Sequence, residues 1–248
     1  MASGPHHLVL RDPAAAAGTL QLGLHHEQQH QELLLTDIRH ALSQNPLLPA
    51  YAPVPAAGAS SPGSAAPLRW ARWGGGPVQV GHDAAGATGF AFDNESPRHT
   101  GWLARAGDGS AREGYTQFTL HGEQPLDAAA PVCHLSGYEA AAFAAWAGAR
   151  LPTEFEWEHG ASAQAAPVRQ LHGEVWQWTA SAYAPYPGFR PLAGPAAEYN
   201  GKFMVNQLVL RGSSFATPDG QARHSYRNFF PAAARWQFSG LRLARDAG

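Results

Sequence analysis

The sequence has almost no cysteine, no excess of either charge and no long apolar run. Its 248 residues include a single cysteine, Cys133, so no intramolecular disulfide can form, and we expect a reducing, cytoplasmic setting. Seventeen Lys and Arg against nineteen Asp and Glu leave a formal charge of −2, which argues against a nucleic-acid partner and a polybasic membrane anchor. No apolar run reaches the roughly 20 residues of a membrane span, and we expect no signal peptide.

The first part of the chain has the pattern of one long helix. From Ala14 to about Ser43 leucines and an isoleucine recur at helical spacing, and Asn45-Pro46 then ends the pattern. The stretch from Leu47 to Pro67 is rich in Ala, Pro, Ser and Gly and has no periodicity, as expected of a linker. We therefore divide the chain into a helical segment (1–46), a linker (47–67) and a second domain (68–248).

The second domain combines short strands, glycine-rich turns and a few helices. Strand-like runs occur at 78–80, 117–120 and 207–210. A helix is predicted from Gly137 to Gly148, and its expected apolar face consists of Tyr138, Ala141, Ala142, Ala145 and Trp146. A second short helix should begin after Thr153, because Glu156 follows three residues later and completes a capping box. Such a mixture predicts an α+β fold.

A histidine cluster in the first helix carries the sharpest chemical signal. Residues four apart share one helix face, so His26 and His30 can present both imidazoles to one metal ion. The alternative is a solvated polar helix face that contains histidines by chance. The same letters also satisfy H-E-x-x-H, in which Glu27 would be the general base of a zinc hydrolase. That hypothesis needs a third ligand, and no metzincin-like continuation follows His30.

Several long segments together resemble one enzyme family. They are GLHHEQQHQELLLTDIRHALSQNPLLPAY (23–51), FAFDNESPRH (90–99), PVCHLSGYEAAAFAAWAGARLPTEFEWE (131–158), GEVWQWTASAYAPYPGF (173–189), YNGKF (199–203), VLRGSSFAT (209–217) and YRNFFPAAARWQFSGLRLARD (226–246). The first resembles the end of the DinB-like helical bundle of ergothioneine synthases (hercynine oxygenases, or sulfoxide synthases). The others resemble the C-terminal domain of these enzymes, which has the formylglycine-generating-enzyme fold, a variant of the C-type lectin fold. Selenoneine synthase is a close relative.

The resemblance implies a metal site on the first helix and a substrate site beside it. It makes His26 and His30 ligands of non-haem Fe(II), and it places Gln29 in the hercynine pocket. It also implies that Asn228 contacts the trimethylammonium group of hercynine and that Phe229 flanks the substrate.

A tyrosine acts as an acid near the bound oxygen in some members of this family. The candidates in this sequence are Tyr183, Tyr186 and Tyr199. The family's third iron-binding histidine comes from early bundle helices that have no counterpart in this sequence. Its replacement would be His25, His6, His7 or a residue of a partner subunit.

The implied reaction is Fe(II)- and O2-dependent formation of a C–S bond in ergothioneine biosynthesis. The thiol of cysteine or γ-glutamylcysteine would be joined to hercynine, or a selenol would be the donor. The alternative is a truncated homologue that binds hercynine or another small molecule without catalysing a reaction. A single helix would expose its apolar side, so we expect it to pack on the second domain or on another copy in a homo-oligomer.

Formylglycine-generating enzymes themselves use a cysteine pair after a strand that resembles Val209–Gly212. The segment 213–228 contains no cysteine, and Cys133 lies elsewhere, so that dithiol chemistry is not available. We expect Cys133 to be a small buried residue. Trp157, Trp176 and Trp178 are expected to form much of the core of a domain that is rich in loops.

Overall fold

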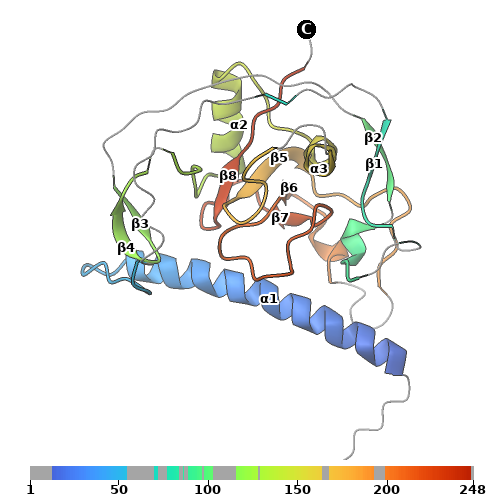
Figure 1. Cartoon of the computed structure of the whole chain (residues 1–248), viewed down its shortest axis with the longest axis horizontal. Helices are drawn as coiled ribbons and strands as arrows, with labels where there is room; N and C mark the ends of the chain where they lie inside the picture. Colours follow the sequence, from blue (N-terminus) through green and yellow to red (C-terminus); the bar gives the residue numbers. More distant parts are fainter. Residues whose placement is uncertain are drawn as a thin grey trace, which may run out of the picture.

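The long first helix has the predicted bounds and lies along one side of the second domain. The computed structural model describes residues 13–54, 70–71, 77–83, 86, 89–96, 98–102, 116–127, 129–163, 168–192 and 199–246. Helix α1 (Pro13–Ser43) extends along almost the whole length of the molecule (Figure 1). No helix in this described part is long and apolar enough to cross a membrane. Most of the predicted linker, together with His6, His7 and the segment 105–112, lies outside the described residues.

Among the described residues, the second domain contains, in addition to its helices, three small sheets, two antiparallel and one mixed. They are the hairpin of β1 (Pro77–Val80) with β2 (His99–Trp102), the hairpin of β3 (Thr116–Thr119) with β4 (Gly122–Pro125), and a four-stranded sheet in the order β7-β6-β5-β8. The strands of the last sheet are β5 (Trp176–Ala182), β6 (Leu208–Arg211), β7 (Asn228–Phe230) and β8 (Ser239–Leu241). All its neighbours are antiparallel except the parallel pair β5–β8. The three predicted strand-like runs fall in or beside β1, β3 and β6, which confirms those predictions.

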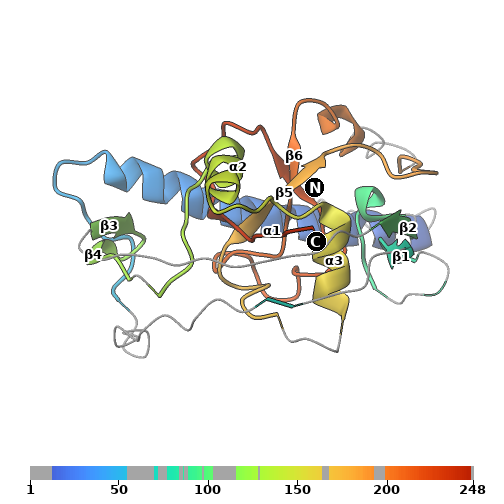
Figure 2. The same ribbon diagram turned by 90° about the horizontal axis from the view of Figure 1, so that it is seen from above.

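The hairpins lie towards the two ends of α1. In both Figure 1 and Figure 2 the β3–β4 hairpin lies by the C-terminal end of α1, and the β1–β2 hairpin lies by its N-terminal half. A 3₁₀ turn, η1 (Asp93–Glu95), precedes β2, and another, η3 (Gly201–Phe203), precedes β6. The four-stranded sheet lies between α1 and the two shorter helices (Figure 1).

The two short helices begin at capping boxes. Helix α3 (Glu154–Ser162) begins as predicted, because Thr153 Oγ1 accepts from the Glu156 amide and the Glu156 carboxylate accepts from the Thr153 amide at 2.6 Å. Helix α2 (Gly137–Trp146) uses Ser136 and Glu139 in the same way. Each box satisfies backbone donors that the first helical turn would otherwise leave unpaired.

The predicted apolar face of α2 is wrong. Ala140 and Ala144 are buried, whereas Tyr138 is 67% exposed and Trp146 is 78% exposed. Almost every residue of this helix is apolar, so the sequence contains two equally apolar faces, and close packing selects the one with the smaller side chains. At the start of that face, a Cβ on Gly137 would lie 3.1 Å from the Leu208 side chain, so a larger residue would require this side chain of β6 to shift.

The core lies between the four-stranded sheet and α2, as the tryptophans predicted. Trp157, Trp176 and Trp178 are 3%, 2% and 0% exposed, respectively. Gly212 follows β6 with φ +95°, and a Cβ at that position would lie 2.4 Å from the Leu171 carbonyl oxygen. Only glycine fits this turn, which keeps the strand end against the loop before β5.

Polar contacts help to hold helix α1 on the domain, in addition to Leu22 and Leu35, which pack against its core. Glu32 is buried and accepts hydrogen bonds from Trp176 Nε1 at 2.6 Å, Ser214 Oγ at 2.8 Å and Thr217 Oγ1 at 2.7 Å. Farther along the helix, the Arg39 guanidinium donates to the Phe118 carbonyl oxygen, with Nε at 2.9 Å. The helix thus packs on the second domain, which is one of the two arrangements that the sequence predicted.

Candidate functional site

His26 and His30 lie next to each other on α1. Their ring centroids are 4.3 Å apart and the ring planes cross at 62°. The edge of the Tyr199 ring lies against His26, with centroids 5.1 Å apart. Burial lowers the pKa of His26, the neighbouring His30 lowers it further and Glu27 partly opposes this. A lowered pKa favours the neutral imidazole, which is the form that binds metals.

Gln29 is fixed between two tyrosine hydroxyls. Tyr199 donates a hydrogen bond to Gln29 Oε1, and Gln29 Nε2 donates to Tyr226 Oη at 2.5 Å. Burial raises the pKa of both tyrosines, so each hydroxyl keeps its proton at neutral pH. The amide predicted for the hercynine pocket is therefore oriented by the second domain, beside the histidine pair.

An aromatic wall continues from Tyr199 into the domain. The Phe92 ring stacks on Tyr199, with centroids 5.7 Å apart and planes 16° apart, and its edge contacts Tyr226. The Arg223 guanidinium lies 5.8 Å from the Phe92 ring centroid and forms an ion pair with Glu95 at 2.6 Å. This wall gives the site a rigid apolar boundary with a fixed cation behind it.

His25 lies on the domain side of α1. Its ring stacks on Phe90 with centroids 3.9 Å apart and planes 15° apart. Burial and the nearby Arg223 lower the pKa of His25, and its buried Nδ1 has no hydrogen-bond partner among the described residues. The ring thus packs against the aromatic wall, whereas His26 and His30 contact each other.

The donor set fits part of a metal site. Two neutral imidazoles on one helix turn are suitable ligands for Fe(II) or another first-row divalent ion. Among the described residues, however, no group of three or more His, Cys, Asp or Glu side chains could hold a metal ion. The described part of the chain therefore offers two candidate metal ligands, His26 and His30.

Asn228, Phe229 and Tyr183 belong to a second group of contacts. The Tyr183 and Phe229 rings stack at 4.0 Å with planes 9° apart, and Asn94 Nδ2 donates to Tyr183 Oη at 2.8 Å. Asn228 Oδ1 accepts from the Phe229 amide at 2.9 Å. The described contacts of these three residues do not include the histidine pair, so the predicted substrate residues divide between two groups.

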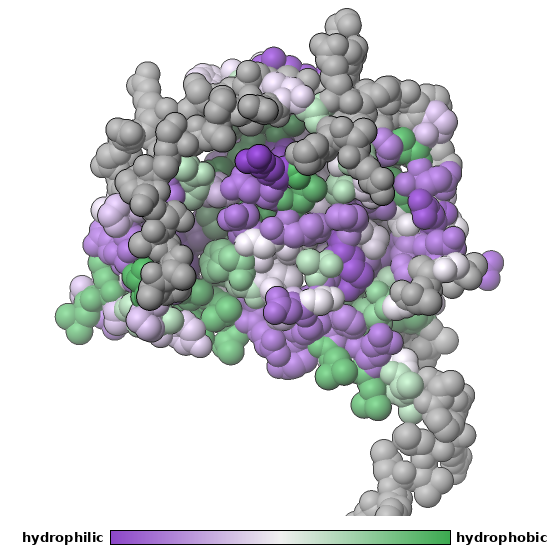
Figure 3. Space-filling view, viewed as in Figure 1, coloured by the Kyte–Doolittle hydropathy of each residue, from purple (hydrophilic) through white to green (hydrophobic). Residues whose placement is uncertain are grey.

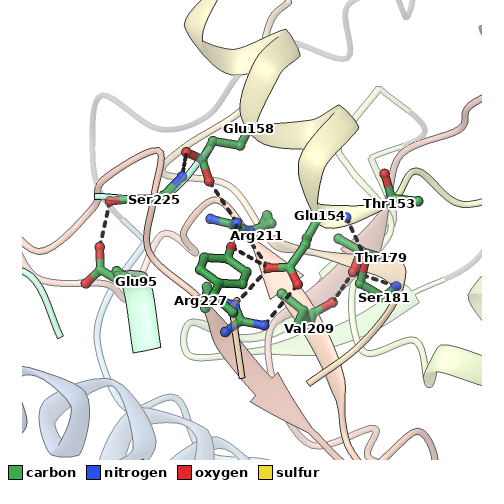
Figure 4. A network of polar contacts seen from close by, with 12 residues as sticks. Glu95, Thr153, Glu154, Glu158, Thr179, Ser181, Val209, Arg211, Ser225 and Arg227 are labelled. Carbon is green, nitrogen blue, oxygen red and sulfur yellow. Dashed lines mark hydrogen bonds and ion pairs between the residues drawn. The ribbon is translucent and has the colours of Figure 1, made fainter. Parts of the chain in front are cut away.

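Tyr186 makes hydrogen bonds to a buried ion network. In this network Glu154, at the start of α3, pairs with Arg211 of β6 at 3.1 Å and with Arg227 at 2.8 Å (Figure 4). Tyr186 Oη donates to Glu154 at 2.9 Å, and Arg211 donates to Tyr186 Oη at 2.8 Å. Burial raises the pKa of Tyr186. Of the three candidate tyrosines, Tyr199 is the one whose described contacts include a histidine of the pair.

The sequence did not predict the roles of several residues in this site. Phe90, Phe92, Tyr226 and Arg223 come from segments that are more than 45 residues from α1 along the chain. Three of them stand in the segments that resemble the family, but nothing local to them predicts an approach to the helix. A cavity of about 600 Å³, between β1 and α3, lies apart from all the predicted site residues.

These features match a known family. The chain belongs to the family of sulfatase-modifying factor enzyme 1-like domains, whose model matches residues 79–167 and 163–247. This confirms the predicted formylglycine-generating-enzyme-like domain and, with the mixed helices and sheets, the α+β class.

The relatives also confirm the resemblance to ergothioneine synthases. A hercynine oxygenase of Mycolicibacterium smegmatis is 28% identical to this chain over 312 residues, covering 91% of this chain and 71% of that protein. The hercynine oxygenase of Mycobacterium tuberculosis is 34% identical over 165 residues, covering 50% of this chain and 38% of that protein. A formylglycine-generating enzyme of Streptomyces coelicolor is 50% identical over 175 residues, covering 47% and 53%. The chain therefore spans about two fifths to seven tenths of the hercynine oxygenases that it matches.

Proposed function

We propose that this chain works in the C–S bond-forming step of ergothioneine biosynthesis, as a non-haem Fe(II) oxygenase. The contact of His26, His30 and Tyr199 beside the fixed Gln29 amide carries the proposal. The names of the related hercynine oxygenases support the substrate. Iron would supply O2 activation, and histidine ligands with open positions suit that chemistry.

The proposed reaction balances without a further reductant. A thiol of cysteine or γ-glutamylcysteine, hercynine and O2 give a sulfoxide and water. The S–H bond and the imidazole C2–H bond break, and a C–S bond forms. One oxygen atom of O2 is bonded to sulfur in the product and the other leaves as water.

The chain's own residues would bind and orient the substrates. Gln29 can hydrogen-bond a ring nitrogen of hercynine, because the tyrosines on both sides fix its amide. Tyr199, whose burial raises its pKa, is a protonated donor at the histidine pair. The Phe229 ring offers a face for the trimethylammonium group, which cannot donate hydrogen bonds. Asn228 lies in the chain between Phe229 and Arg227, and Arg227 belongs to the buried ion network.

Two other functions, zinc-dependent hydrolysis and formylglycine formation, are not favoured. Glu27 is exposed, which leaves the zinc-hydrolase hypothesis without a general base that faces an enclosed site. Formylglycine formation by a cysteine pair is not available, because Cys133 is the single cysteine of the 248 residues. Burial also raises the pKa of Cys133 to about 11, so its thiol is a poor nucleophile at neutral pH.

A second candidate is a binding protein that retains the hercynine pocket without the reaction. The presence of two imidazoles, and no third ligand among the described residues, favours it. Both candidates predict hercynine binding that depends on Gln29. Only the oxygenase predicts consumption of O2 with formation of the sulfoxide.

The test is an anaerobic Fe(II) titration of the purified chain, with and without hercynine. The proposal predicts saturable binding that His26→Ala abolishes and that His40→Ala, an exposed histidine on the same helix, leaves unchanged. The loaded protein is then given O2, hercynine and cysteine or γ-glutamylcysteine, and the sulfoxide is measured by mass spectrometry. Hercynine binding without iron binding or product would support the second candidate and contradict the first.

A further inference from the structure

The 3₁₀ turn η3 and the two residues before it connect the two groups of predicted site residues. At one end of this segment, the Tyr199 ring contacts the histidine pair, with its centroid 5.1 Å from that of His26. At the other end, the Phe203 ring lies against Phe229, with centroids 5.6 Å apart and planes 32° apart. A residue inside the segment is therefore close in the chain to contacts with both groups.

The segment is anchored to the domain at its centre. Asn200 is 3% exposed, and its Nδ2 donates to Asp93 Oδ1 at 2.6 Å. Two backbone hydrogen bonds close the turn, from the Phe203 amide to the Asn200 carbonyl oxygen at 3.0 Å and from the Met204 amide to the Gly201 carbonyl oxygen at 3.2 Å. These contacts fix the backbone from which the side chains of the turn project.

Lys202 is the middle residue of this turn and the only lysine among the 248 residues. Its side chain is exposed, and its Nζ lies 5.3 Å from the centroid of the Phe203 ring. Hydrophilic side chains cover much of the face of the molecule shown in Figure 3, so exposure alone does not mark a binding residue. What distinguishes Lys202 is its place beside Phe203, which in turn lies against Phe229.

In the described part of the chain, Lys202 differs from the other cations that lie against aromatic rings of the two groups. Arg223 pairs with Glu95 at 2.6 Å, and Arg227 pairs with Glu154 at 2.8 Å. Both carboxylates are buried, so these two guanidinium charges are already compensated. The ion pairs between described residues do not include Lys202. Its ammonium is the cation of this set that can pair with an anion from outside.

Hercynine brings such an anion. It carries its carboxylate on the same carbon as the trimethylammonium group, so the partner of the carboxylate must lie close to the surface that holds this group. The proposed function assigns the trimethylammonium group to the Phe229 ring. Lys202 lies beside the ring that packs against Phe229. A carboxylate that enters a site without a partner loses its hydration at a high cost in free energy.

We propose that Lys202 binds the carboxylate of hercynine and so selects an amino-acid betaine over an amine without a carboxylate. This inference rests on the proposed function and deepens it. The lysine ammonium has three donors on a flexible stem, which suits a contact at the edge of a pocket. The contact is the same before and during the reaction, so its loss should raise the KM for hercynine and leave kcat unchanged.

The first test compares two ligands by anaerobic calorimetry on the Fe(II)-loaded full chain: hercynine, and an analogue in which hydrogen replaces the carboxylate. Lys202→Met should weaken hercynine binding about three- to tenfold and leave the affinity for the analogue unchanged. Lys202→Arg should keep most of the affinity, because it keeps the charge. Arg235→Met is the matched control, since Arg235 is 66% exposed and pairs with Glu139 of α2; it should change neither affinity.

Gln29→Ala separates this inference from the proposed function. Both ligands contain the imidazole, so loss of the Gln29 amide should weaken both. If Lys202→Met weakens both ligands equally, or neither, the carboxylate contact is overturned and the proposed function stands. If the wild-type chain does not bind hercynine, both proposals are overturned.

The second test uses the single side-chain amine of the chain. Acetylation of Lys202 by acetic anhydride can be followed by mass spectrometry, with the terminal α-amine as the internal control. Hercynine should slow the acetylation of Lys202 and leave that of the terminal amine unchanged, and the analogue should slow neither. Protection of Lys202 by cysteine or γ-glutamylcysteine but not by hercynine would assign the contact to the thiol donor and contradict the proposal.

Discussion

At the scale of single residues, burial changes the protonation of side chains that the sequence marks only as polar. His134 has φ +63° and lies with its ring edge against Phe238, with centroids 5.4 Å apart. Burial, with Arg39 as a second cause, lowers the pKa of His134 from 6.5 to about 4. Protonating this ring in the folded protein therefore destabilises it.

The pH dependence of stability should reveal this histidine. The unfolded chain binds a proton near pH 6.5 and the folded chain only near pH 4, so stability falls as the pH falls through this window. The shift corresponds to at most about 3 kcal/mol, at 1.36 kcal/mol for each unit of pKa. His134→Asn, which tolerates a positive φ, should lose less stability between pH 7 and pH 4 in urea unfolding. His40→Asn is the control, and equal pH slopes for His134→Asn and wild type would contradict the assignment.

Single residues also mark the limit of prediction from sequence. His26, His30 and Gln29 could be chosen in advance because their spacing on one helix is local information. Arg223 and Phe92 could not, because their contacts with the site depend on how segments more than 45 residues away along the chain pack on α1. The substrate-binding roles of Asn228 and Phe229 were inferred from the family resemblance, and they stay predictions.

At the scale of elements, the buried ion network joins α3 to the central sheet. Glu154 accepts from Arg227 Nη2 at 2.9 Å as well as from Arg211, and all three side chains are almost fully buried. Glu158, one turn later, pairs with Arg211 at 2.8 Å. Because these charged side chains lie away from water, each one is stabilised by the ion pairs that it makes with its partners.

Removing one charge from this network should be costly. Glu154→Gln leaves Arg211 and Arg227 with less compensation, and we expect a loss of about 3–5 kcal/mol of unfolding free energy. Asp246→Asn is the matched control, because that carboxylate is 70% exposed and pairs with a partly exposed Arg150; its expected loss is under about 1 kcal/mol. Denaturant unfolding of both variants measures the difference. Similar losses for the two variants would show that the network contributes no more than a surface pair.

Elements also show where sequence patterns succeed and fail. The start of α3 was predictable because Thr153 and Glu156 form a cap within four residues. The packed face of α2 was not, because a helix that is apolar on all sides contains no periodic signal. There the size of Ala140 and Ala144, and the closeness of β6 to Gly137, determine the orientation.

At the scale of the whole molecule, a buried carboxylate on α1 helps to attach this helix to the domain. Glu32 accepts three hydrogen bonds, and burial raises its pKa in spite of them. Trp176→Phe removes one donor and should lower the unfolding free energy by about 1–3 kcal/mol, because a buried acceptor loses a partner. Trp146→Phe, at a 78% exposed site, should change it by under about 0.5 kcal/mol. Calorimetry of the two variants tests this, and equal midpoints would contradict it.

The central claim concerns the metal on α1 and is tested most directly by X-ray absorption at the iron edge. The measurement uses the full chain loaded anaerobically with Fe(II), and compares wild type with His26→Ala and His30→Ala. The account predicts the scattering pattern of imidazole ligands in wild type, with fewer histidines in each variant. An iron spectrum without imidazole scattering, or one that both variants leave unchanged, would contradict the assignment of the histidine pair.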